Sequence, residues 1–406
     1  MDIKETLERE KFKMRILFIN VLYEPYIGGG AEITLKNLVE GIQNLGHEVK
    51  VLSFWDKDDK EEGVNRIPVY RAKIPNIYLP YGNIRHPFLK RMLWHILDIY
   101  NPIAKNLVLK NIRKYKPDLV SIHNTYGWSC SIRDAVSESN VPAIQVLHDL
   151  YLLCPKNMFK NNTVCKKKCL ICKLMRLPCE LKSNKLKAVV GISNFILDHY
   201  LNYGYFQDVP VKKVIYNSRK LDTNINRKVD FNYINFGFIG TLASNKGIEV
   251  LLKAYHKIKK PNYRLFVAGS GKEDYEEYLK SKYKDNSIVF MGRVDPKDFF
   301  EKVDVTIVPS IWYEPLGMIV VESFAFSVPV IGSNIGGIPE MISEGINGML
   351  FDPYKKGDLE EKLLKFEAEI DHWRSKSDII KQSALKFLDY NGWLNQWEGL
   401  YKLVLS

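Results

Sequence analysis

Two glutamates stand at a spacing that suits the binding of a phosphate-bearing polyol. Glu314 opens the tetrapeptide that ends at Gly317, and Glu322 lies eight residues after Glu314. A helix expected over Met318–Ala325 would place Glu314 in the preceding loop and Glu322 about one to two turns inside the helix. Carboxylates accept hydrogen bonds from hydroxyl groups, and the N–H groups at a helix start attract phosphates. The pattern favours a ligand site, although a capped surface helix with incidental acidic residues would show the same spacing.

A glycine cluster marks a second place where the backbone can approach a phosphate. The segment Gly28–Gly30 follows an expected strand and leads through Ala31-Glu32 directly into a helix. Adjacent glycines permit positive φ and close backbone approach, and the helix start offers free N–H groups. The G-x-G-x-x-G dinucleotide fingerprint is not met, because Ile33 occupies the position of its third glycine. Alone, such a cluster is also typical of a plain turn.

Two histidines come at the ends of expected strands. His148-Asp149 closes the strand expected over Ala143–His148, and His123-Asn124 closes the one over Asp118–His123. Ligands of parallel sheets bind outside the carboxyl ends of the strands. A single histidine at a strand end is by default a structural residue, but this position favours a functional one, more so for His148 than for His123.

The elements that must position these residues are short apolar strands alternating with helical patterns, which is the signal for parallel sheets with crossover helices. Helices are expected over Ala31–Leu45 and Gly247–Lys257. The other strands are expected over Arg15–Val21, Glu48–Phe54, Ala188–Ile192 and Val211–Tyr216, and then, where the pattern restarts, over Asn235–Gly240, Tyr263–Gly269, Ser287–Met291, Asp304–Pro309 and Val328–Ser333.

The restart of the pattern predicts two doubly wound domains, each with its own sheet. The polar stretch Asn217–Tyr233 separates them. We expect one domain over 14–217 with a cysteine-rich insertion over 151–187, and a second domain over 218–385. Two facing halves would enclose a cleft. The segment 386–406, with a helix over Tyr390–Leu405, is expected to pack back on the first domain, although it could simply cap the second.

Composition and charge narrow the class of protein. The 406 residues are 46% hydrophobic and 26% charged, which fits a globular protein of two domains. Met1–Lys13 has no apolar centre and does not read as a signal peptide, and no stretch approaches the roughly 18 apolar residues of a spanning helix. We expect a cytoplasmic protein, peripheral at most at the inner face of the membrane.

The net charge of +12 is concentrated in two segments of the first half. Leu89–Lys116 carries seven basic residues against one acidic residue, and Tyr151–Lys187 carries ten against one. This distribution predicts a phosphate-bearing acceptor or an anionic membrane surface as partner. The alternative is a lysine-rich solvated surface. No nucleic acid is expected, because no nucleic-acid-binding motif accompanies the charge.

Five of the six cysteines lie within a short basic segment. Clustered thiols in a reducing compartment favour a structural zinc site over disulfides. The ligands predicted are Cys154, Cys165, Cys169 and Cys172, with Cys179 able to replace Cys154. Buried free thiols, a redox pair or an iron–sulfur cluster are the alternatives, and the irregular spacing matches no known finger.

Taken together, four motifs resemble the GT-B glycosyltransferases of family 4. They are Gly28–Glu32, Lys246-Gly247, Glu314–Gly317 with Glu322, and Gly336–Glu340. The resemblance runs from about Met14 to the C-terminal helix. It implies an α/β GT-B fold, with two facing Rossmann-like doubly wound domains, a central cleft and a C-terminal crossover helix. It also implies a retaining transfer of a sugar from a nucleotide-diphosphate sugar, UDP- or GDP-linked.

The resemblance assigns roles to residues of this chain. Glu322 would bind the ribose hydroxyls, Glu314 the hydroxyls of the donor sugar, and Lys246 would neutralise the diphosphate. His148 would face the donor sugar, and His123, Asn124 and Asp149 would lie on the acceptor side. Backbone amides would hold the diphosphate at Gly29, Gly30, Leu316, Gly317, Met318 and Ile319.

The implied mechanism is a front-face reaction in which the leaving diphosphate takes the acceptor proton. Lys246 and the helix-start amides would stabilise that charge without a catalytic metal. The chain departs from many relatives at Thr241, where an arginine is usual; Arg293 or a basic residue of the first half would have to compensate.

The resemblance leaves the acceptor and some rival functions open. We expect a glycan or lipid-linked acceptor, as in surface-polysaccharide assembly. Nucleotide-sugar epimerases and sugar phosphorylases share the fold, and a non-catalytic nucleotide- or glycan-binding protein is the other alternative.

Overall fold

The computed structural model describes residues 13–81, 86–225 and 230–406. The signal-peptide expectation therefore concerns a segment that lies, except for Lys13, outside the described residues. Contacts divide the chain into two compact units. Unit 1 comprises Met1–Met158, Lys166–Asn217 and Asn391–Ser406, and unit 2 comprises Phe159–Cys165 and Ser218–Tyr390.

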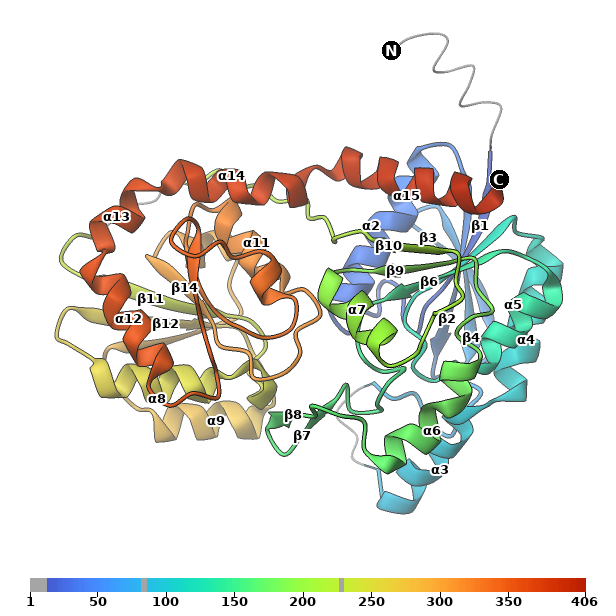
Figure 1. The fold of residues 1–406 in the computed structure, drawn as a ribbon, viewed down its shortest axis with the longest axis horizontal. Coiled ribbons are helices and arrows are strands. Elements are labelled where there is room, and N and C mark those ends of the chain that lie inside the picture. Colours follow the sequence, from blue (N-terminus) through green and yellow to red (C-terminus); the bar gives the residue numbers. More distant parts are fainter. Residues whose placement is uncertain (1–12, 82–85, 226–229) are drawn as a thin grey trace, which may run out of the picture. The chain divides into compact units, whose positions relative to one another are not determined.

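Unit 1 is built on a sheet with the strand order β10-β9-β6-β5-β1-β2-β4-β3 (Figure 1). Neighbouring strands are parallel except β3 and β4, which form an antiparallel pair at the edge. The central strands are mainly apolar and almost entirely buried because helices cover both faces of such a sheet. The strands are β1 (Arg15–Ile19), β2 (Glu48–Trp55), β3 (Lys60–Val64), β4 (Ile67–Lys73), β5 (Leu119–Ile122), β6 (Ala143–Leu147), β9 (Ala188–Gly191) and β10 (Val211–Val214).

The helices of unit 1 begin and end at recognisable signals. The α4 helix has Asn101 as its N-cap, with Pro102 at the first position and Lys116 left-handed at the end. The α7 helix starts at the side-chain cap Ser193. The helices are α2 (Gly30–Asn44), α3 (Phe88–Ile99), α4 (Pro102–Tyr115), α5 (Ser131–Ser139), α6 (Leu170–Leu181) and α7 (Asn194–Asn202).

Unit 2 has a parallel sheet with the order β13-β12-β11-β14-β15-β16. The short hairpin of β7 (Phe159–Lys160) and β8 (Thr163–Val164) also belongs to this unit. The sheet strands are β11 (Ile234–Ile239), β12 (Tyr263–Ala268), β13 (Ile288–Gly292), β14 (Val305–Val308), β15 (Val330–Ser333) and β16 (Gly348–Phe351). The helices are α8 (Ile248–Ile258), α9 (Glu273–Lys282), α10 (Pro296–Phe300), α11 (Met318–Ala325), α12 (Asp358–Ala368), α13 (Ile370–Ser375) and α14 (Ser377–Leu388).

Two separate apolar cores form in unit 2. One contains side chains of α8 and α12, among them Leu251 and Leu363. The other gathers Phe299 and Phe300 of α10 with Phe326, which follows α11. Helices α8 and α12 therefore pack in one core and α10 in the other, as expected of a doubly wound sheet.

The last helix, α15 (Tyr390–Leu405), packs within unit 1 from Asn391 onward. Its buried side chains include Trp393, Trp397 and Tyr401. The ring of Tyr401 meets that of Phe18 on β1 with centroids 6.4 Å apart. Glu398 lies 3.1 Å from His47 Nε2, which ties the helix to the segment before β2. None of the described helices is both long enough and apolar enough to cross a membrane.

The predicted α/β fold of two doubly wound parallel sheets is confirmed. Every predicted strand is present, with ends that agree within two residues. The sequence prediction omitted the β3–β4 pair, strand β16 and several helices, among them α3 and α6.

Candidate functional site

Glu314 is held in place by close backbone packing in unit 2. It lies in the loop between β14 and α11. A Cβ on Gly336 would lie 2.3 Å from the Glu314 carbonyl oxygen, and Gly337 N–H donates to that oxygen at 2.7 Å. A Cβ on Gly247 would lie 1.7 Å from the carbonyl oxygen of Pro309. The glycines of two sequence motifs are therefore required by close approach of the backbone to the loop that carries Glu314.

The carboxylate of Glu314 accepts three polar contacts. Lys246 Nζ lies 2.7 Å from its Oε2, Trp312 Nε1 donates to the same oxygen at 2.9 Å, and Ser310 Oγ donates at 3.3 Å. The ammonium group of Lys246 also lies 5.1 Å from the centroid of the Trp312 ring. The structure thus brings Lys246 and Glu314 together as a half-buried ion pair beside an indole.

Glu322, one turn inside α11, pairs with a cation that the sequence prediction missed. Arg219 Nε lies 3.3 Å from Glu322 Oε1, and the two side chains are only 14% and 19% exposed. Burial raises the pKa of the Glu322 carboxyl, and Arg219 opposes that shift. The available signal was the pair Arg219-Lys220 just after the last strand of unit 1, at the start of the polar break.

The start of α11 has the features of an anion-binding helix end. Gly317 is its N-cap with φ of 88°, and no side chain caps the helix. Leu316 is buried, whereas Met318 and Ile319 are half-buried. An uncapped helix start presents backbone N–H groups and a positive dipole end to a ligand.

Thr241 stands where the family resemblance would place an arginine, and Arg293 was one residue expected to compensate. Thr241 is exposed beside Gly240, which has φ of 154°. Arg293 donates through Nε to Ser270 Oγ at 2.6 Å. Arg219, through its contact with Glu322, is a cation of unit 2 that the sequence prediction did not include.

In unit 1, the glycine cluster leads into α2, whose N-cap Gly29 makes no side-chain cap of its own. Gly29 is the N-cap, and the Glu32 carboxylate three residues on receives hydrogen bonds from the backbone of Gly29 and Glu32. Burial raises the pKa of Glu32. A Cβ on Gly28 would lie 2.8 Å from the Tyr81 ring. A phosphate at this helix start would have to compete with Glu32 for the Gly29 amide, whereas Gly30 lies in the first turn.

His123 and His148 form a buried pair. His123 Nδ1 lies 3.0 Å from His148 Nε2, and His123 Nε2 lies 3.1 Å from Ser121 Oγ. Burial lowers the pKa of His148 to about 4 and holds that of His123 well below its usual range. Both rings are therefore neutral at neutral pH, and one proton lies between them. His148 Nδ1 is buried and has no hydrogen-bond partner among the described residues, so its hydrogen-bonding capacity is unused in the free protein.

The residues that follow these histidines shape the local turns. Asp149 Oδ1 accepts from the Tyr151 N–H at 2.9 Å, and burial raises the Asp149 pKa to about 6. Asn124 Oδ1 accepts from the Tyr126 N–H at 3.2 Å, and the Asn124 N–H donates to Asn20. One side-chain oxygen of each residue is therefore engaged in a hydrogen bond within its own loop.

A cavity of about 630 Å³ lies in unit 1 beside α3. Its aromatic wall includes Tyr78, Tyr81 and Tyr126, and its basic groups include Lys73 and Arg91. Aromatic faces pack against sugar rings, and cations attract phosphate, so this lining fits a phosphorylated glycan.

The cysteine segment does not assemble the predicted four-thiolate set. Cys172 Sγ lies 3.4 Å from Cys154 Sγ, and Cys169 is exposed near them. Cys165 belongs to unit 2, and Cys179 pairs instead with Cys130. Over residues 13–81, 86–225 and 230–406, no three Cys, His, Asp or Glu side chains are placed to hold a metal ion. The division of this segment between the two units explains why spacing alone was misleading.

Two family models match successive parts of the chain. The one described as Glycosyltransferase Family 4 matches residues 28–218. The one described as Glycosyl transferases group 1 matches residues 223–384.

Known proteins resemble the chain over nearly its whole length. An uncharacterized 42.6 kDa protein in the cps region of Klebsiella pneumoniae is 31% identical, over 92% of this chain and 99% of that protein. Sucrose-phosphate synthase from Thermosynechococcus elongatus has a TM-score of 0.73 at 17% identity, covering 97% of this chain and 99% of that one. HepE from Anabaena, solved with UDP and glucose, has a TM-score of 0.68 at 18% identity, covering 96% and 99%. The two solved structures share the fold.

Proposed function

The chain belongs to the family 4 glycosyltransferases of group 1, and from this membership we propose a retaining transfer from a nucleotide-diphosphate sugar to a glycan or lipid-linked acceptor. The observation that carries the proposal is the cluster at the start of α11. Lys246 and Glu314 lie 2.7 Å apart, Glu322 pairs with Arg219, and the helix between them begins uncapped.

Each group of the cluster has a proposed part in donor binding. The α11 amides and Lys246 hold the diphosphate, because an uncapped helix start and an ammonium group both attract phosphate oxygens. Glu322 accepts hydrogen bonds from the ribose, and Glu314 from the donor sugar. Arg219 keeps the Glu322 carboxylate charged and oriented against the effect of burial.

The reaction follows from where charge develops. The bond between the anomeric carbon and the diphosphate oxygen breaks, the acceptor oxygen attacks from the same face, and the acceptor proton passes to the leaving diphosphate. Lys246 and the helix amides stabilise the negative charge that grows on that diphosphate. Neutral His148 positions a sugar hydroxyl through Nδ1, because its lowered pKa makes it a poor proton donor at neutral pH.

The relatives and the lining of the cavity indicate which donor and acceptor to test. UDP is the first donor nucleotide to test, because HepE was solved with UDP and glucose; GDP is the second. The cavity beside α3, with tyrosines and Arg91, suits a phosphorylated or lipid-linked glycan. The relative from a cps region favours surface-polysaccharide assembly at the membrane.

Calorimetric titration with UDP, GDP, ADP and dTDP tests the donor site without knowledge of the acceptor. We expect one nucleotide to bind preferentially and Glu322→Ala to abolish that binding. Release of the nucleotide diphosphate from its sugar in the presence of membrane glycolipids would then show transfer, and the anomeric configuration of the product would show retention. If none of the four nucleotides binds, the donor-site assignment fails and a non-catalytic binding protein becomes the better reading. Altered donor sugar without transfer would indicate an epimerase.

A further inference from the structure

The α3 helix exposes its apolar face, whereas a normal surface helix buries it. Its fully buried side chains are Trp94 and Asp98, four residues apart on one face. The opposite face is apolar and exposed, with Phe88 at 75% and Leu89 at 65%. The remaining exposed apolar side chains of this face are Met92, Leu93, Ile96 and Leu97. A helix that buries a carboxylate and exposes leucines has an apolar face without a partner among the described residues.

The α6 helix repeats this reversal within the cysteine-rich segment. It buries Cys172, Arg176 and Cys179. Its exposed apolar side chains recur at helical spacing, namely Leu170, Ile171, Leu174, Leu177 and Leu181, with Leu170 at 70%. Two helices of unit 1 therefore turn apolar faces away from the protein.

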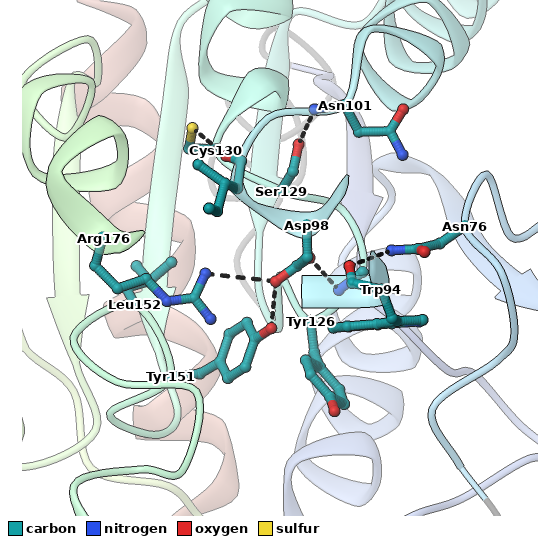
Figure 2. A network of polar contacts seen from close by, with 12 residues as sticks. Asn76, Trp94, Asp98, Asn101, Tyr126, Ser129, Cys130, Tyr151, Leu152 and Arg176 are labelled. Carbon is teal, nitrogen blue, oxygen red and sulfur yellow. Dashed lines mark hydrogen bonds and ion pairs between the residues drawn. The ribbon is translucent and has the colours of Figure 1, made fainter. Parts of the chain in front are cut away.

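A buried polar network joins the two helices. Figure 2 shows the Asp98 carboxylate of α3 between the guanidinium of Arg176 on α6 and the hydroxyl of Tyr151. Arg176 Nη1 lies 3.4 Å from Asp98 Oδ2, and its guanidinium carbon lies 4.3 Å from the centroid of the Tyr151 ring. Asp98 Oδ1 also accepts the Gly127 N–H at 2.9 Å. These charges face inward and pair with each other, so the network fixes which faces of α3 and α6 remain outside. Arg176 Nε and Nη2 have no hydrogen-bond partner among the described residues.

Exposed basic side chains lie on the same two helices and next to them. Arg91 and Lys173 are exposed on the two helices, and Lys166 and Lys167 are exposed just before α6. Neither lysine of this pair has an acidic partner among the described residues. The two segments that contain α3 and α6 carry net charges of +6 and +9. A second copy of this chain would bring the same positive charge to the contact, whereas an anionic bilayer supplies both the apolar depth and the opposite charge.

We propose that the exposed faces of α3 and α6 dock the protein on an anionic lipid bilayer. The leucine and isoleucine side chains enter the boundary between headgroups and acyl chains, and the nearby lysines and arginines meet the lipid phosphates. Arg91 of α3 also lines the 630 Å³ cavity, so docking through α3 would hold that cavity within about a helix diameter of the bilayer that carries a lipid-linked acceptor. This last consequence rests on the proposed function, but the docking itself does not.

Vesicle co-sedimentation of the full chain tests the proposal. The wild type should sediment with vesicles of phosphatidylcholine and phosphatidylglycerol, and much less with phosphatidylcholine alone. The triple variant Leu170→Gln/Ile171→Gln/Leu174→Gln should lower the partition coefficient by roughly a hundredfold. Neutralising Lys166, Lys167 and Lys173 to glutamine should have an effect of about the same size, and only on anionic vesicles at low salt.

The matched control replaces exposed apolar side chains of unit 2. Ile379→Gln/Leu385→Gln on α14 alters side chains that are 48% and 56% exposed and should leave vesicle binding unchanged. The proposal is overturned if the wild type stays in the supernatant, or if the α6 triple variant sediments like the control. It is also overturned if light scattering shows a wild-type dimer that the triple variant separates, because the occupant would then be a second copy.

Nucleotide titration of the same proteins separates this proposal from the proposed function. The triple variant should keep wild-type nucleotide affinity while losing vesicle binding. Wild-type protein that binds vesicles but no nucleotide would leave the docking surface standing and remove the donor site.

Discussion

Replacing Glu322 by glutamine gives the sharpest test of the donor site. The side chain is 19% exposed and pairs with Arg219, so the substitution keeps its shape and removes its charge. A hydrogen bond to a charged group contributes about 1.5–3 kcal/mol, and glutamine keeps a weaker, neutral acceptor. We expect a loss of about 1–2 kcal/mol in nucleotide binding, the difference between a charged and a neutral acceptor, which raises Kd roughly 5- to 30-fold.

Calorimetry of the preferred nucleotide against wild type, Glu322→Gln and Arg219→Met measures this effect. Glu344→Gln, an exposed glutamate of the same unit, is the matched control and should bind like wild type. Thermal unfolding of each variant identifies changes due to folding alone. If Glu322→Gln keeps wild-type affinity but unfolds earlier, the residue is structural and the ribose assignment is wrong.

The pH dependence adds a second check on Glu322. Burial raises its folded-state pKa above the usual carboxylate value. Between those two pKa values the folded protein binds a proton that the unfolded chain has already lost. The free energy of unfolding should therefore fall as pH rises from the ordinary carboxylate pKa through the raised one. Nucleotide affinity should change in the opposite sense and weaken as pH falls through the raised pKa. Glu322→Gln should flatten both profiles.

Two further substitutions test the scaffold. Gly247→Ala should destabilise the protein by about 2–4 kcal/mol in denaturant unfolding and weaken nucleotide binding. The reason is that the added Cβ would lie 1.7 Å from the Pro309 carbonyl oxygen, at a residue with φ of 71°. Unchanged stability would contradict this close packing. Asp134→Asn should cost about 2 kcal/mol at neutral pH: burial raises the Asp134 pKa, but hydrogen bonds from Lys182 and Lys185 outweigh it and hold the pKa at about 2. Because the folded pKa lies below the unfolded one, this stabilisation is present above about pH 4 and is lost between about pH 4 and 2. Urea titrations should therefore show a difference in unfolding free energy between wild type and variant at pH 7 that disappears at pH 2.

Parallel strands were the part of the fold that the sequence revealed best. Strands buried on both faces are continuous apolar runs, and β6 and β14 were located within a residue at each end. The β3 strand was missed because Lys60–Val64 is an exposed edge with no apolar run. Helix α3 was missed because its apolar residues face outward, so their spacing does not indicate which side packs on the core.

Within the candidate site, local motifs were readable and long-range pairings were not. The glycines that the Glu314 loop requires lie in short motifs, but the reason for each is a backbone approach from a distant segment. Arg219 meets Glu322 across about a hundred residues, a separation that spacing arguments do not reach. The partition of the cysteines is a similar case, because Cys165 and Cys169 are neighbours in sequence and belong to different units.

The contact between Lys246 and Glu314 has a consequence for how tightly a donor can be held. In the free protein the carboxylate of Glu314 pairs with the Lys246 ammonium group that a phosphate would use, and so takes the place of the substrate phosphate. On the proposed donor assignment, a donor has to replace Glu314 as the partner of Lys246, and part of its binding energy offsets the loss of that ion pair. The same exchange releases the carboxylate to meet the sugar only when a phosphate has arrived. A sugar without its nucleotide would therefore find both groups still locked to each other, which makes discrimination against free sugars a property of the resting site.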